Sequence, residues 1–310
     1  MKNQLILFFF LIYSCEMVLD IDPPPHTKSL VVGGLMVADS MIYISVKDDR
    51  AILDNTQGFN TIKGASVAIY EEGELFAILQ EVDTVDWNDE KTTIYLSYEK
   101  PTVGKSYRLE IEKSGFENIS AVERVPRPPV FDVEEVYIET NEYDNPELNF
   151  KIKIDDSPGA DYYNILVSAY YKSIENTYDE DWEITGTEIV DNIRNIGIYF
   201  ENELIIEDYM DGSIFTDILF DGREYNINLI GDLWFFDINN DDFDPELRFI
   251  FELRNISEAT YNFLYTSELY RTVNEDFTAE PVQVYSNIEN GKGIFGSYSS
   301  SFVEFIPDLD

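Results

Sequence analysis

The chain has 310 residues, of which 61 are Asp or Glu and 21 are Lys or Arg, so its formal net charge is −40. Hydrophobic residues make up 44% of the chain, which is enough for a packed core and excludes a disordered protein. Phosphate backbones and anionic lipid both repel so acidic a surface, which argues against nucleic-acid binding and against adsorption of the protein surface to a membrane.

The first 15 residues predict a lipoprotein signal peptide. Lys2 precedes the apolar run Leu5–Leu11, which is too short to span a bilayer, and the small residue Ser14 stands directly before Cys15. This end of the segment resembles the lipobox of bacterial lipoproteins. An ordinary signal peptide cut nearby would instead leave Cys15 as a free thiol. We favour covalent lipid at Cys15, because it is the only cysteine and lies where acylation requires one.

Residues 16–27 follow as a spacer, in which three consecutive prolines favour a stiff, extended chain. Residues 28–127 then show short strands separated by turns, a pattern typical of an Ig-like β-sandwich. The clearest strand is Ser106–Glu112, where apolar and charged residues alternate. The unit Lys100–Phe116 resembles the last hairpin of carboxypeptidase-regulatory-like modules. The other predicted strands are Leu30–Val32, Met41–Val46, Ala65–Tyr70, Leu75–Leu79 and Thr92–Tyr98.

A proline-rich linker, Val125–Pro129, separates this sandwich from a larger β-rich domain at 130–310. Near 257–273 apolar residues recur at helical spacing after Ser257, which can cap a helix. The fold class is therefore all-β with one helix. The predicted strands of the second domain are Val133–Glu139, Leu148–Ile154, Tyr162–Tyr171 and Tyr225–Ile230, followed by a final hairpin of Pro281–Ile288 with Ile294–Tyr298.

The residues needed for common catalytic sites are scarce. His26 is the only histidine and lies in the proline-rich spacer, so a Ser-His-Asp triad, a Cys-His pair and a multi-histidine zinc site are excluded. We therefore predict that the protein is not an enzyme. A hydrolase with two carboxylates is the remaining catalytic hypothesis, which an acidic pair facing a cleft would support.

One acidic stretch has the composition of a cation site. Asp237, Asn239 and Asp241 place oxygen ligands at alternating positions, as a calcium loop requires. The stretch departs from an EF-hand, because Asp242 stands where glycine is expected and Arg248 where glutamate is expected. We hold calcium binding as a hypothesis beside an acidic hairpin loop, and we predict no other cofactor.

The segment 287–301 contains three glycines and four serines. Small residues at a bend are typical of a tight turn followed by an edge strand. The same residues would let another backbone approach closely, so Gly291, Gly293, Gly296 and Tyr298 are candidate partner contacts.

Five blocks of residues, spread over nearly the whole chain after the signal peptide, carry a family resemblance. They are Ser14–Glu16, Leu30–Leu35, Lys100–Phe116, Asp211–Phe215 and Ala279–Ser301. Together they resemble a lipoprotein family of unknown function from Bacteroidota, domain of unknown function 4249. The resemblance implies an outer-membrane lipoprotein, held on the cell-surface face by its N-terminal lipid alone, with a TonB-dependent β-barrel receptor as its partner. No chemistry of particular residues is implied.

The functional hypothesis is accordingly an accessory subunit that captures or gates the ligand of a TonB-dependent transporter. The alternative is a stand-alone surface adhesin or glycan-binding module. Trp87, Trp182 and Trp234 could stack on sugars in such a module, although tryptophan is more often a core residue.

Overall fold

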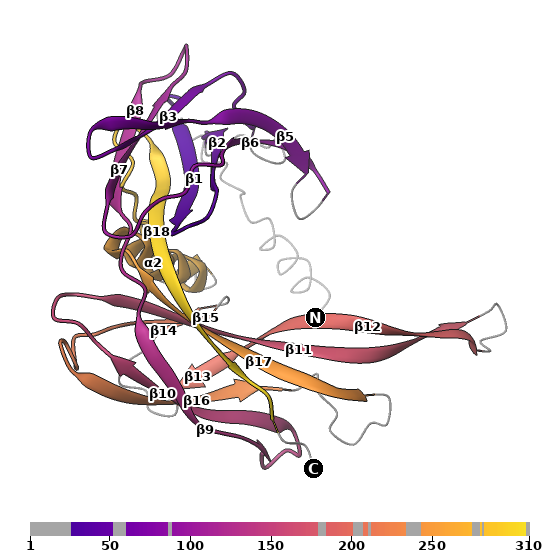
Figure 1. The fold of residues 1–310 in the computed structure, drawn as a ribbon. Helices are drawn as coiled ribbons and strands as arrows, with labels where there is room; N and C mark the ends of the chain where they lie inside the picture. Colours follow the sequence, from indigo (N-terminus) through magenta and orange to yellow (C-terminus); the bar gives the residue numbers. More distant parts are fainter. Residues whose placement is uncertain are drawn as a thin grey trace, which may run out of the picture.

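The computed structural model describes residues 26–51, 60–85, 89–178, 184–200, 207–209, 212–233, 243–274, 280 and 282–307. These residues are mostly strands with one helix, which confirms the predicted fold class (Figure 1). Across this described part of the chain, no helix has the length and apolar character needed to cross a membrane.

The first lobe comes from residues before the proline-rich linker. Its strands are β1 (Leu30–Val37), β2 (Ile42–Asp48), β3 (Ser66–Glu71), β4 (Glu74–Ile78), β5 (Gln80–Val85), β6 (Lys91–Ser97), β7 (Ser106–Glu112) and β8 (Ile119–Arg124). Apolar residues alternate along β2 and β7, so each strand buries one side chain in two. The sheet β4-β3-β7-β8 covers β1, β2 and β6 and encloses a core that contains Ile44, Tyr107 and Ile111.

The second lobe holds the remaining elements. They are β9 (Val130–Thr140), β10 (Pro146–Asp155), β11 (Tyr162–Tyr178), β12 (Ile184–Ile196), β13 (Ile198–Phe200), β14 (Glu207–Tyr209), β15 (Gly212–Thr216), β16 (Glu224–Asp232), β17 (Phe243–Ile256), α2 (Glu258–Asn274) and β18 (Lys292–Phe305). The sheet β13-β16-β10-β9 packs on β11 and β17 around a second core, with Phe150, Leu229 and Phe251 at its centre.

A single ten-stranded sheet joins the two lobes, and β18 is the strand that crosses between them (Figure 1). Residues 292–298 of β18 pair in parallel with β1, and residues 298–305 pair antiparallel with β17. Ile288 and Phe295 belong to the core of the first lobe. The first lobe is therefore completed by the C-terminal end of the chain, in addition to residues 28–127.

The predicted final hairpin is wrong. Residues 282–288 form no regular strand, and β18 pairs with β1 and β17 instead. The side chain of Asn287 holds β18 in place of a second strand: its Nδ2 donates to the carbonyl of Phe295 at 2.7 Å, and its Oδ1 accepts from the Phe295 N–H at 3.0 Å. An amide side chain thus supplies one donor and one acceptor where a neighbouring backbone was expected.

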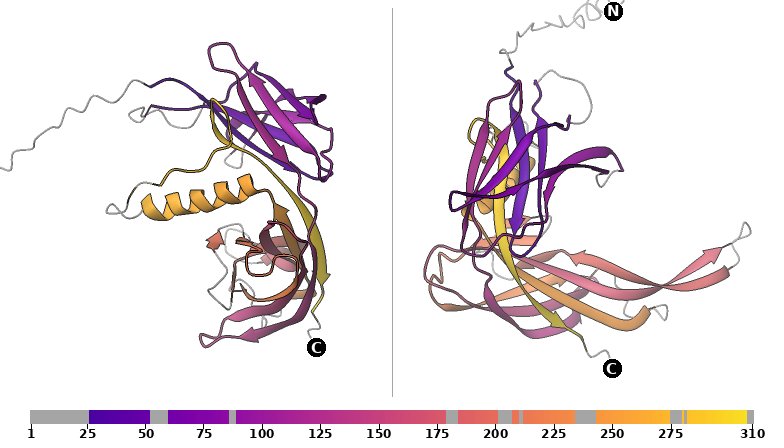
Figure 2. Two further views of the ribbon diagram at one scale, coloured as in Figure 1. Left: turned by 90° about the vertical axis from the view of Figure 1, so that its left-hand side faces the viewer. Right: turned by 45° about the horizontal axis from the view of Figure 1, so that its top comes forward.

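The predicted helix is confirmed. Ser257 caps α2, because its Oγ accepts from the Thr260 N–H at 3.2 Å. The helix packs on the long sheet, and the rings of Tyr162 and Tyr261 lie 5.0 Å apart. Leu264 and Leu269 are only half-buried, since the helix lies on one side of the sheet rather than inside a core (Figure 2).

Candidate functional site

The outer face of the long sheet is the side turned away from the core of the second lobe. Phe249, Phe251 and Leu253 of β17 point into that core, so the alternating residues Arg248 and Arg254 point to the outer face. Helix α2 covers this face at the Tyr162 end of β11. The opposite end is uncovered in the described residues, and the groove lies there.

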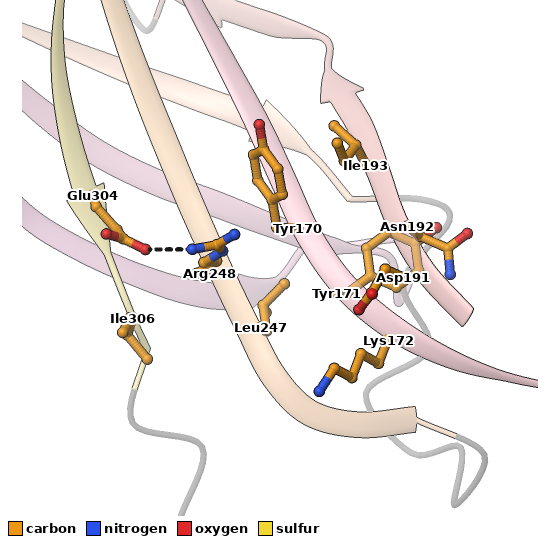
Figure 3. Close-up of a pocket in the computed structure, with 10 residues that line it drawn as sticks. All are labelled: Tyr170, Tyr171, Lys172, Asp191, Asn192, Ile193, Leu247, Arg248, Glu304 and Ile306. Carbon is orange, nitrogen blue, oxygen red and sulfur yellow. Dashed lines mark hydrogen bonds and ion pairs between the residues drawn. The ribbon is translucent and has the colours of Figure 1, made fainter. Parts of the chain in front are cut away.

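The groove has a volume of about 680 Å³ and is bordered by β12, β11, β17 and β18 (Figure 3). Arg248 lies at its centre: the guanidinium carbon is 4.7 Å from the centre of the Tyr170 ring, and Nη1 is 3.1 Å from Oε1 of Glu304. The face of an aromatic ring attracts a cation, and the ion pair restrains the arginine further. Arg248 is therefore held in a defined position although it is exposed.

A second arginine is held in the same way on this face. The guanidinium carbon of Arg254 lies 4.6 Å from the centre of the Tyr298 ring, and its Nε donates to Oε1 of Glu252 at 2.7 Å. Ser300 donates to the same glutamate oxygen at 2.6 Å. Phe302 pairs with Glu252 across the strands, and 63% of its surface is exposed.

Apolar side chains complete the groove. Ile193 on β12 and Ile306 after β18 line it and are 65% and 67% exposed. Lys172 and Asp191, which face each other across β11 and β12, line it as well. Among the side chains that the structure describes, the charged ones lining the groove are two cations and two anions, in a chain of net charge −40. Ordered arginine and tyrosine beside exposed apolar groups are typical of protein contact surfaces.

An acidic triad with two buried members and one half-buried member lies elsewhere in the second lobe. Asp156, Asp161 and Asp217 bring carboxylate oxygens within 4.8 Å of one another. Asp156 accepts from the hydroxyl of Tyr163 and from the Gly222 N–H, and Asp217 accepts from the Asp161 N–H at 3.0 Å. These oxygens have the chemistry to hold a divalent cation.

Burial and the charges of neighbouring aspartates raise the pKa of two members of the triad, Asp161 and Asp217. Desolvation is the main cause that raises the pKa of Asp161, and the neighbouring Asp156 and Asp221 raise it further, while the hydrogen bond from Asn255 opposes the rise. Burial likewise raises the pKa of Asp217, with the charges of Asp156 and Asp161 contributing. Asp161 and Asp217 therefore hold protons more tightly than exposed aspartates do.

The junction of the two lobes contains a cleft of about 600 Å³, lined by both Asp161 and Glu123. Glu123 is only 8% exposed, and burial raises its pKa to about 7. Its Oε1 accepts from the Arg124 N–H at 2.7 Å, whereas Oε2 has no hydrogen-bond partner. A side chain with so little exposed surface cannot contact a substrate as a general acid must, so we interpret Glu123 as a structural group at the lobe junction.

Several residues singled out from the sequence lie outside the described residues. These are Cys15, the calcium candidates Asp237, Asn239 and Asp241, and the tryptophans Trp87, Trp182 and Trp234. The acidic triad was missed by sequence reasoning. Asp156 and Asp161 flank a Ser-Pro-Gly turn, which is a readable signal, but Asp217 lies 56 residues beyond Asp161 and only the fold brings it near.

The predicted partner-contact residues divide into two groups. Tyr298 lies on the outer face beneath Arg254. Gly291, Gly293 and Gly296 instead pack within the chain: an added Cβ would lie 3.0 Å from the carbonyl oxygen of Leu30, 2.0 Å from that of Val32, and 2.3 Å from Oγ1 of Thr260, respectively. The part of β18 that contains Gly293 and Gly296 pairs with β1, and the pairing of β18 with β17 begins only at Tyr298.

The structure thus defines a two-lobed all-β protein whose lobes share one sheet. Residues 16–302 match the family model described as Domain of unknown function (DUF4249), and the chain belongs to this family. No curated protein matches the chain.

Proposed function

We propose that the protein is an outer-membrane lipoprotein, exposed at the cell surface through lipid on Cys15, and that it acts as an accessory subunit of a TonB-dependent transporter. It would capture or gate the ligand of the transporter, and it would contact the barrel through the groove on the outer face. The role is one of binding rather than catalysis.

The groove is the observation that carries this proposal. Arg248 is fixed between Tyr170 and Glu304, and arginine and tyrosine are the residues most often found at the energetic centre of protein interfaces. The balance of charge among the described lining residues supports the same conclusion, because two cations beside two anions repel a partner surface less than an all-acidic surface would.

The arrangement of the other candidate groups supports binding over catalysis. His26, the only histidine of the chain, has its Nε2 3.2 Å from Oδ1 of Asp49 on the first lobe. Lys292 also contacts Asp49, with 2.8 Å between Nζ and Oδ2. This histidine therefore belongs to a contact that joins β18 to the first lobe.

The test is recovery of a partner. Tagged full-length protein, expressed at its native level in the source organism and extracted in mild detergent, should co-purify with a receptor-sized barrel protein in near-equal amount. Arg248→Glu and Tyr170→Ala should each lower that recovery at least about tenfold, the loss expected when an interface anchor is removed.

The first lobe offers a matched control. The guanidinium carbon of Arg108 lies 4.8 Å from the centre of the Tyr70 ring, so Arg108→Glu and Tyr70→Ala disturb the same kind of stack at another place. These two variants should recover the barrel as the unmodified chain does. Equal recovery in all four variants would exclude the groove as the contact. Recovery of the lipoprotein alone, with the transporter expressed, would favour the stand-alone adhesin or glycan-binding module.

A further inference from the structure

Strand β12 is an edge strand of the long sheet in the part of the chain that the structure describes. In the described part of the chain it pairs only with β11, over nearly its whole length from Ile184 to Ile196. An edge strand presents a row of backbone N–H and C=O groups that can pair with another chain. Proteins commonly protect such an edge with proline, lysine or a covering loop, and β12 contains neither proline nor lysine.

The strand also lies on an extended ribbon. In the described residues, the pairing of β11 with β17 reaches Ser173, whereas its pairing with β12 continues to Tyr178 (Figure 1). The ribbon projects from the second lobe, and the right view of Figure 2 shows it apart from the first lobe. Ile189 and Ile193 of β12 are 63% and 65% exposed. Exposed isoleucines on an open edge indicate a surface that is covered in an assembly.

We propose that β12 pairs antiparallel with β12 of a second copy of this chain, about a two-fold axis that passes through Asp191 perpendicular to the sheet. Such an axis places each residue opposite the one equally far on the other side of Asp191. Ile189 then faces Ile193 of the second copy, and Glu188 faces Arg194. Because the contact is isologous, each of these pairs occurs twice.

The charges favour this register. Two Glu–Arg pairs and two Ile–Ile pairs stabilise neighbouring antiparallel strands. The two copies of Asp191 meet at the axis, but each is already opposite Lys172 of its own β11, so the acidic pair is flanked by two cations. A second copy of β12 that runs in the opposite direction therefore places complementary residues opposite those of the first.

Other registers lose this match. Moving the axis to Val190 places Ile189 opposite Asp191, and moving it to Asn192 places Ile189 opposite Asn195. Either slip also separates Glu188 from Arg194. Since the pairing pattern specifies the register of a strand, the axis at Asp191 is the one that keeps both the apolar and the charged pairs.

A disulfide across the axis tests the register directly. The full-length chain in mild detergent with Asp191→Cys should form a cross-linked dimer under a mild oxidant, because residues opposite each other across antiparallel strands have a Cα separation that suits a disulfide. Glu188→Cys is the matched control, since it faces Arg194 and not its own copy. The unmodified chain, which contains Cys15, gives the background.

Exchange of charges provides a second measurement. Glu188→Arg or Arg194→Glu alone makes both charged pairs repulsive and should raise the dimer dissociation constant about tenfold. A mixture of the two variants restores both pairs, so it should form mixed dimers as tightly as the unmodified chain. Circular dichroism establishes that each variant is folded.

The outcomes separate the proposal from its alternatives. Cross-linking through Asp191→Cys alone, together with rescue in the mixture, supports the dimer. Equal cross-linking at both cysteine positions, or a monomer by light scattering at every concentration, overturns it. Association that depends on added lipid vesicles and not on Glu188 or Arg194 would overturn it in favour of a membrane contact.

Discussion

Replacement of the buried carboxylate at the lobe junction should change how stability depends on pH. Glu123 is a residue of β8, is 8% exposed and lies near the start of α2 and Ser297 of β18. Burial is the main cause that raises its pKa from 4.5 to about 7; the charge of Glu258 adds to the rise, while Ser257 and Ser297 oppose it. Glu123→Gln removes the charge and keeps an oxygen that can accept from the Arg124 N–H.

The raised pKa of Glu123 makes the free energy of unfolding fall as the pH rises. The folded protein holds the Glu123 proton more tightly than the unfolded chain does, so this group favours the folded state most below pH 4.5. That advantage is lost as the pH rises to about 7 and stays constant above it. A pKa difference of one unit corresponds to about 1.4 kcal/mol, so the free energy of unfolding falls by roughly 3 kcal/mol between pH 4 and pH 8. The Glu123→Gln variant has no ionisable group at this position, so its free energy of unfolding does not show this decrease.

Urea denaturation followed by circular dichroism at pH 4, 6 and 8 measures the effect. The free energy of unfolding of Glu123→Gln, relative to the unmodified chain, should increase by roughly 3 kcal/mol across this range. Glu117→Gln, at an exposed position before β8, is the control and should leave the difference constant. A constant difference for Glu123→Gln as well would refute the argument from burial.

Three further predictions concern packing and the N-terminus. Gly293 has a φ of 100° and pairs with Val32, so Gly293→Ala should lower the free energy of unfolding by at least about 1–3 kcal/mol in urea; a neutral result would contradict the β1–β18 pairing. Leu264→Ala and Leu269→Ala should each cost about 1–2 kcal/mol, below the range for fully buried leucine, because both are half-buried. Cys15→Ala should abolish labelling by radioactive palmitate and release the protein from membranes, and undiminished labelling would exclude this cysteine as the lipid site.

Alternation of apolar residues predicted several strands that have one buried and one exposed face, although β8 and β17, which alternate in the same way, were missed. Ser106–Glu112 was predicted with the bounds that β7 has, and the helix after Ser257 was predicted within a residue or two. Strand β12 gave no such signal, because nearly all of its side chains are exposed or half-buried on both faces of the ribbon. Strand β5 was missed for the same reason, as a polar strand at the edge of the sheet.

Local sequence patterns do not identify which strands pair with one another. The glycines of β18 were interpreted as a surface that a partner could approach, and close approach does occur, but to β1 and α2 of the same chain. Nothing near Gly293 in the sequence identifies Val32 as its neighbour. Local patterns could not predict the groove either. Arg248, Tyr170 and Glu304 come from three separate strands and meet only through the sheet order β11-β17-β18.

Strand β18 connects the two lobes rigidly, because it packs in both of them. Its first half contributes Phe295 to the core of the first lobe, and its second half contributes Val303 and Phe305 to the packing of the second. A hinge between the lobes would have to break backbone pairing with β1 or β17, since Tyr298 pairs with both. Helix α2 lies on the outer face beside Gly296, and the groove lies beyond it on strands that pack on the core of the second lobe. Strand β18 therefore fixes the position of the groove relative to the first lobe.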